Sequence, residues 1–179
     1  MAEQGHEIGL HGGRNHRLWV NDSPNWSLDH LREEIAWGTG QLRAAGIEPY
    51  GFASPGAVSP DRLPDTLESL GYTYVSDRLA QGEVGCSRSE GGLTSVPVSI
   101  LGDPGAVGYL EWARASRFEE IEFRSEFTGR LAVGGDAVVA YDHPGWAGVR
   151  DLTRVRTLVE LAQDGGFEVT TIRKMVESG

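Results

Sequence analysis

Short apolar runs alternate with amphipathic segments along this chain, and glycine or proline follows most of them. Runs of this length between turn residues indicate β-strands, whereas apolar positions recurring every three or four residues indicate helices. Strand and helix in alternation predict an α/β fold with a mainly parallel sheet. The predicted strands are Glu7–His11, Tyr50–Ala53, Tyr72–Val75, Leu93–Leu101, Asp136–Tyr141 and Phe167–Ile172.

Four regions carry helical patterns. Ser27 is a suitable N-cap for a helix that ends at Gly46. A shorter helix around Leu63–Leu70 tolerates Pro64 only in its first turn, where no backbone hydrogen bond is lost. The third region, residues 112–133, predicts one or two helices, and the fourth is an amphipathic helix that Asp151 caps and Gly165 and Gly166 terminate. Residues 79–92 are polar and glycine-rich, which predicts an exposed loop.

Composition limits the classes of function. At 179 residues the chain predicts a single domain spanning residues 1–179. The net charge of −10 disfavours nucleic acid and anionic membranes as partners, and the single Cys86 excludes an internal disulfide. We find no signal peptide and no apolar run approaching the roughly 18 residues of a membrane span, so the sequence as given predicts a cytoplasmic protein.

Three histidines follow predicted strands. His11 and His16 flank the Gly12-Gly13 turn after the first strand, and His143 follows the apolar run that ends at Tyr141. Imidazoles at the carboxyl ends of parallel strands are suited to a divalent metal or to proton transfer, although they could equally be ordinary loop histidines. His6 is expected to be structural and His30 to lie exposed on a helix.

The segment Gly5-His6-Glu7-Ile8-Gly9, followed by two histidines, resembles the metal-binding signature of polysaccharide deacetylases, the carbohydrate esterase family four that includes chitin and peptidoglycan deacetylases. Residues 51–56, 70–74 and 96–98 and the segment Tyr141-Asp142-His143 resemble later motifs in the same order. The resemblance implies a deformed (β/α) barrel. It also implies that His11 and His16 bind Zn²⁺ or another divalent metal and that His143 is the general acid.

Three departures from the family pattern concern the same site. The family begins with a strand that ends in two aspartates, and no such strand precedes Gly5; Ala53 replaces an arginine; and one extra residue separates His11 from His16. These differences predict a barrel incomplete at its N-terminus, weak metal binding and impaired activity. The acids that could substitute for the missing base are Glu7, Asp77, Asp103 and Asp142, and the aromatic residues that could stack on sugars, unless they belong to the core, are Trp112 and Trp146.

The resemblance therefore implies a metal-dependent hydrolase that cleaves carbon–nitrogen amide bonds in N-acetylated sugars. The main alternative is a catalytically inactive homologue that acts as a carbohydrate-binding or interaction module, and a third is a truncated product without a function of its own. An incomplete barrel would expose sheet edges at Glu7–His11 and Phe167–Ile172, so we also expect self-association through an open edge.

Overall fold

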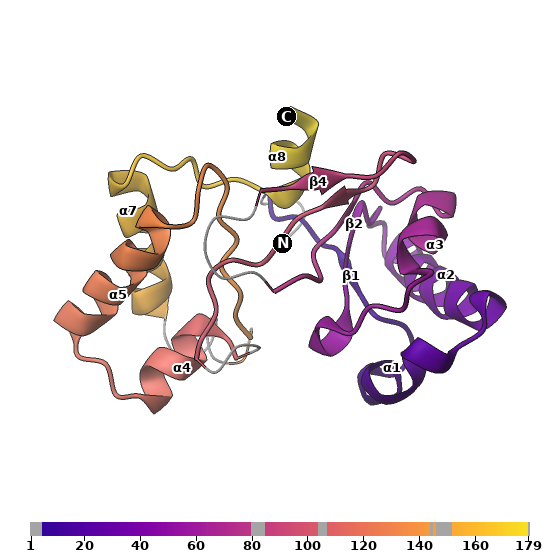
Figure 1. The fold of residues 1–179 in the computed structure, drawn as a ribbon, viewed down its shortest axis with the longest axis horizontal. Coiled ribbons are helices and arrows are strands. Elements are labelled where there is room, and N and C mark those ends of the chain that lie inside the picture. Colours follow the sequence, from indigo (N-terminus) through magenta and orange to yellow (C-terminus); the bar gives the residue numbers. More distant parts are fainter. Residues whose placement is uncertain (1–4, 80–84, 104–106, 144, 146–151, 179) are drawn as a thin grey trace. The chain divides into compact units, whose positions relative to one another are not determined.

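The computed structural model describes residues 5–79, 85–103, 107–143, 145 and 152–178 (Figure 1). The chain divides into two compact units. The first comprises Met1–Arg78, Cys86–Val96 and Thr170–Gly179, and the second comprises Leu79–Gly85 and Pro97–Val169.

The first unit contains a five-stranded sheet with the strand order β1-β2-β3-β5-β4. Four strands pair in parallel, and β4 pairs with β5 in the antiparallel direction. The predicted α/β architecture with a mainly parallel sheet is confirmed. The strands are β1 (Leu10–His11), β2 (Gly51–Ala53), β3 (Tyr74–Val75), β4 (Ser87–Arg88) and β5 (Thr94–Ser95).

Two helices of the first unit, Leu28–Ala44 and Leu63–Ser69, begin and end close to the predicted residues, whereas the helix at His16–Asp22 lies where the sequence predicts a loop and the one at Ile172–Ser178 was not predicted. The Ser27 hydroxyl caps the longest helix by accepting a hydrogen bond from the His30 amide at 3.2 Å, and Gly46 follows its end with a φ of +76°. The helices are α1 (His16–Asp22), α2 (Leu28–Ala44), α3 (Leu63–Ser69) and α8 (Ile172–Ser178), with 3₁₀ turns η2 (Ser23–Asn25) and η3 (Pro55–Ala57).

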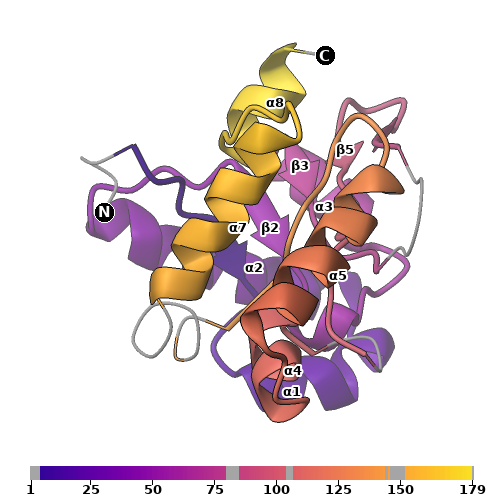
Figure 2. The ribbon, with the colours of Figure 1, turned by 90° about the vertical axis from the view of Figure 1, so that its left-hand side faces the viewer.

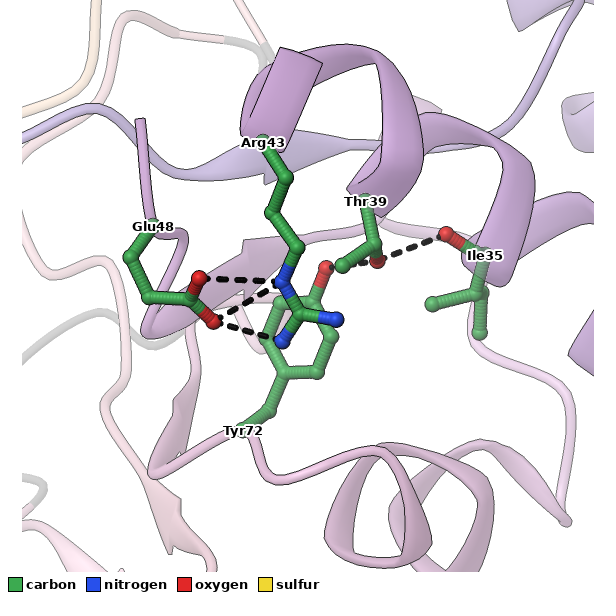
Figure 3. A network of polar contacts seen from close by, with 5 residues as sticks. All are labelled: Ile35, Thr39, Arg43, Glu48 and Tyr72. Carbon is green, nitrogen blue, oxygen red and sulfur yellow. Dashed lines mark hydrogen bonds and ion pairs between the residues drawn. The ribbon is translucent and has the colours of Figure 1, made fainter. Parts of the chain in front are cut away.

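The apolar face of α2 packs closely on the sheet. A Cβ atom at Gly38 would lie 2.7 Å from Leu10, so a larger side chain at this position would push the helix away from β1. At the next residue, the Thr39 hydroxyl lies 2.8 Å from the Ile35 carbonyl and 2.7 Å from the Tyr72 hydroxyl, whereas the neighbouring ion pair of Arg43 is exposed (Figure 3). The core around these contacts includes Trp19, Leu31, Ile35, Phe52, Leu63 and Leu67.

The second unit is mainly helical. It contains α4 (Tyr109–Ala115), α5 (Glu120–Ala132) and α7 (Leu152–Asp164), and the last two helices lie side by side (Figure 2). Glu119 and Glu122 form a capping box at the start of α5. The core of this unit includes Ile100, Tyr109, Phe123, Phe127 and Leu131.

Several predicted strands differ from those observed. The strand predicted for Phe167–Ile172 is wrong, because Ile172 begins α8 and the Thr171 hydroxyl accepts a hydrogen bond from the Lys174 amide at 3.2 Å. A β-branched pair of threonines resembles a strand in sequence, but here one hydroxyl caps a helix. The Asp136–Tyr141 segment forms a single bridge, from Ala140 to Ile100, in place of a strand.

Other boundaries are shorter or fall elsewhere. The strands predicted for Glu7–His11 and Leu93–Leu101 shrink to two residues each, and β4 lies within the predicted loop of residues 79–92. The predicted cap Asp151 lies outside the described residues, while Gly166 ends α7 with a φ of +86° as expected. None of the described helices has the combination of length and apolar composition that crossing a membrane requires.

Candidate functional site

His11 and His16 come together in the first unit. His11 ends β1 and His16 begins α1, and their ring centroids lie 5.2 Å apart with 54° between the ring planes. Both residues are exposed. A tetrahedral ion with nitrogen ligands at about 2.0–2.1 Å would hold two imidazole centroids about 5 Å apart, so the separation of this pair fits a shared divalent metal.

The His11 ring is oriented by the neighbouring strand. Its Nδ1 lies 2.9 Å from the carbonyl oxygen of Ala53, the residue paired with His11 across β1 and β2. Because a carbonyl can only accept a hydrogen bond, Nδ1 carries a proton, and in the neutral ring the lone pair is then on Nε2. Histidines that ligate metals usually donate their other ring N–H to a carbonyl or carboxylate, which fixes tautomer and orientation, and the His11 contact has this form.

A glycine turn connects the two histidines. Gly12 has a φ of +78°, and a Cβ atom there would lie 2.6 Å from the Pro55 ring. The Asn15 side chain then caps α1 by accepting a hydrogen bond from the Leu18 amide at 3.0 Å. The indole of the buried Trp19 donates to the Val58 carbonyl at 2.9 Å and anchors α1 in the core.

The pair would supply two donors to an ion. Among the described residues, no group of three or more histidine, cysteine or acidic side chains is placed to hold an ion. The Glu7 carboxylate accepts hydrogen bonds at 2.9 Å from the Tyr74 hydroxyl and from the Arg173 amide. Burial and the Glu7 charge raise the pKa of Tyr74, so the phenol stays protonated and Glu7 has a structural role.

Asp77 occupies a different position from Glu7. It follows β3 and accepts a hydrogen bond from the Ser59 hydroxyl, which lies 2.9 Å from that of Ser54. Since β1, β2 and β3 are parallel, their carboxyl ends lie at the same end of the sheet. His11 and Asp77, which end or follow these strands, therefore lie at that end.

His143 lies in the second unit between two side chains. Its Nδ1 is 2.9 Å from a Glu111 carboxylate oxygen, and its Nε2 is 2.9 Å from the Tyr141 hydroxyl. Burial, with smaller contributions from Asp142 and Glu111, raises the pKa of Tyr141. The protonated phenol can donate to Nε2 while Nδ1–H donates to Glu111, so the imidazole is fixed in one tautomer.

Asp142, between Tyr141 and His143, binds backbone amides. One carboxylate oxygen accepts a hydrogen bond from the His143 amide at 2.8 Å, and the other accepts one from the Leu110 amide. Burial raises the pKa of Asp142, and these amide contacts oppose the shift. Asp142 therefore fastens the loop that carries His143 to the start of α4.

The other candidate residues from the sequence that the structure describes are either exposed or packed against the core. His30 is exposed on α2 as predicted, but His6 is also exposed, which contradicts its expected core role. Trp112 packs against Phe118 with ring centroids 4.7 Å apart, consistent with a core residue. Asp103 is exposed in the second unit, and Trp146 lies outside the described residues.

Sequence reasoning missed two acids. Glu34 is buried on α2 and bonds to Arg14 in the histidine turn; its place within the apolar stripe beside Ile35 was the available signal. Glu111 contacts His143 across 32 residues of sequence, and no local pattern could have indicated that contact.

Comparison with known proteins shows which family the chain resembles. The polysaccharide deacetylase family model matches residues 1–75. A structure from Mycobacterium smegmatis, assigned as a polysaccharide deacetylase, aligns with 99% of this chain at 24% identity and a TM-score of 0.70. The resemblance to polysaccharide deacetylases is confirmed. No curated protein sequence matches the chain.

Two further structures share the fold. An assigned polysaccharide deacetylase from Pseudomonas aeruginosa PAO1 aligns with 98% of the chain at 15% identity and a TM-score of 0.65, and PuuE allantoinase aligns with 92% at 17% identity and a TM-score of 0.58. Likenesses at this identity establish the fold, so the predicted deacetylase-type α/β architecture is confirmed. The chain spans 64%, 59% and 55% of the Mycobacterium, Pseudomonas and allantoinase chains, respectively.

Proposed function

We propose that this protein is a metal-dependent hydrolase of carbon–nitrogen amide bonds that deacetylates N-acetylated sugars, with low activity. The observation that carries the proposal is the His11–His16 pair, with ring centroids 5.2 Å apart and Nδ1 of His11 held by the Ala53 carbonyl. His11 and His16 would hold Zn²⁺ or a similar ion. When bound, such an ion polarises the amide carbonyl and makes hydroxide available near neutral pH.

His143 is proposed as the general acid that protonates the nitrogen of the leaving amine. Glu111 accepts the Nδ1–H hydrogen bond at 2.9 Å and would orient the ring. Tyr141, 2.9 Å from Nε2, can donate to the neutral ring or accept from the protonated one. To protonate the leaving nitrogen, Nε2–H would turn from the Tyr141 hydroxyl to the substrate, while Glu111 would keep its contact with Nδ1.

Asp77 is the acid best placed to accept the proton of the attacking water. It follows a strand parallel to the one that ends at His11, whereas Glu7 binds Tyr74 and Arg173, and Asp142 binds two backbone amides. The extra Ser59 contact on Asp77 and the two-histidine donor set support slow turnover.

Zinc binding tests the histidine pair. We expect the purified protein to bind one Zn²⁺ weakly in isothermal titration calorimetry, and His11→Ala or His16→Ala to abolish that binding, because either substitution leaves a single imidazole. His30→Ala removes an exposed histidine from α2 and should leave zinc binding unchanged. Equal binding by all four proteins, or binding by none, would contradict the proposal.

Acetate release from N-acetylglucosamine oligomers tests the chemistry. We expect turnover about 10²–10⁴-fold below that of a complete deacetylase, since a poorly placed base forfeits that factor. Asp77→Asn should remove the remaining activity without changing zinc affinity. Activity unaffected by Asp77→Asn would show that another group accepts the proton.

A second candidate function is a carbohydrate-binding module without catalysis. It is favoured by the absence, among the residues that the structure describes, of a third metal-ligating side chain beside the pair. In that case N-acetylglucosamine oligomers should bind in calorimetry while no acetate is released, even with zinc in excess.

A further inference from the structure

Glu34 is a buried acid on a helix face that is otherwise apolar. Only 7% of the residue is exposed, and its neighbours on α2 include the core residues Leu31 and Ile35. A carboxylate removed from water is costly unless its oxygens are bonded. Here one oxygen accepts a hydrogen bond from the Arg14 amide at 2.8 Å, and the other pairs with the Arg14 guanidinium.

The group that Glu34 binds lies in the turn between the two histidines. Residues 12–15 connect β1 to α1, and Arg14 is their contact with α2. A Cβ atom at Gly13 would lie 2.3 Å from the Glu34 carboxylate, so the acid occupies the space where a side chain would be. The Arg14 guanidinium also lies 5.4 Å from the Trp37 ring centroid, a second contact of the turn with α2.

We propose that Glu34 is a positioning residue for the His11–His16 pair. By bonding the amide of Arg14 it fixes the turn, and the turn sets the separation of the two rings. Glu34 acts through the backbone and contacts neither imidazole nor substrate. The effect of Glu34 on metal binding rests on the proposed function. Its effect on the separation of the two rings does not depend on whether a metal binds.

Nuclear Overhauser contacts between the ring protons of His11 and His16 test the inference in metal-free protein. We expect the contact in the wild type and its loss in Glu34→Gln, because a neutral amide cannot hold both the Arg14 amide and the guanidinium. Zinc affinity should fall at least about 10-fold, the effect typical of losing a group that orients metal ligands. Circular dichroism confirms that the variant is folded.

Thr39→Val on the same helix is the matched control. It removes a buried polar contact with Tyr72, so thermal stability should fall while the ring contact and zinc affinity remain unchanged. Gly13→Ala disrupts the contact between the turn and Glu34 from the other side, so it should also abolish the ring contact and weaken zinc binding. It is the alternative variant if Glu34→Gln does not fold.

The outcomes separate the two proposals. A folded Glu34→Gln or Gly13→Ala variant that retains the ring contact overturns the positioning role, as does a wild-type protein without the contact. A wild type that shows the contact but binds no zinc overturns the metal site alone, and loss of the contact in Glu34→Gln would then still support the positioning role.

Discussion

Asp142 shows how one residue links local contacts to stability. Burial raises the pKa of its carboxyl above the ordinary value, while the amides of Leu110 and His143 favour the charged form. Between the ordinary and the raised pKa, the folded protein binds more protons than the unfolded chain. The contribution of Asp142 to the free energy of unfolding therefore falls as pH rises through that range, and then levels off.

We expect Asp142→Asn to remove this pH dependence. Asparagine cannot accept both amide hydrogen bonds equally well, which gives an offset that does not vary with pH. Apart from that offset, the free energy of unfolding of the variant should rise relative to that of the wild type between about pH 4 and pH 7. The reason is that only the wild type loses stability as its carboxyl ionises. Urea unfolding at both pH values measures the difference, and a difference that is constant or of opposite sign would contradict the assignment.

At the scale of elements, the short turn after β1 depends on a left-handed residue. Gly12 combines a φ of +78° with a close approach to Pro55, so Gly12→Ala would be strained in both respects. We expect it to lower the free energy of unfolding by more than about 1 kcal/mol. Zinc binding should weaken as well, because the same turn separates the histidines.

Gly40→Ala provides the opposite case within one helix. Gly40 lies inside α2, is exposed, and has nothing within 4 Å of an added Cβ atom. Alanine there should raise the free energy of unfolding by about 0.5–1 kcal/mol, because glycine is the poorer helix former. Denaturant unfolding of both variants tests the pair; equal effects would show that backbone conformation at Gly12 is not the cause.

The elements themselves were predictable where local chemistry decides them. The Ser27 cap, the start of α3 next to Pro64 and the glycines that end α2 and α7 lie at the expected residues. Strand lengths were not predictable, since pairing partners far apart in sequence determine them. Phe167–Ile172 illustrates this: its pattern favours a strand, but Thr171 caps α8 and Arg173 binds Glu7 near β1.

At the scale of the whole molecule, the net charge and the exposed edge of the sheet have opposite effects on self-association. Among the described strands, β1 and β4 are the two edges of the sheet. Edge strands present peptide groups that can pair with a second copy, whereas a net charge of −10 repels that copy. We propose weak self-association through β1 that strengthens when salt screens the charge.

Sedimentation velocity at low and moderate salt tests this proposal. Ile8→Lys adds a charge beside β1 and should reduce association at moderate salt. Ile121→Lys places the same charge at a residue of α5 that is 82% exposed, and should have little effect. A protein that is monomeric at both salt concentrations, or that responds only to Ile121→Lys, would contradict association through β1.

The sequence by itself determined the α/β class, most helix ends and three candidate histidines, because periodicity, caps and glycine turns are local properties. It also gave the resemblance to polysaccharide deacetylases, through residues that lie close together along the chain. Only the tertiary structure brought the His11 and His16 rings together, placed Glu34 against the Arg14 amide and set Glu111 beside His143. Each of these contacts joins different elements, and their geometry depends on how helices and strands pack, which no local pattern encodes.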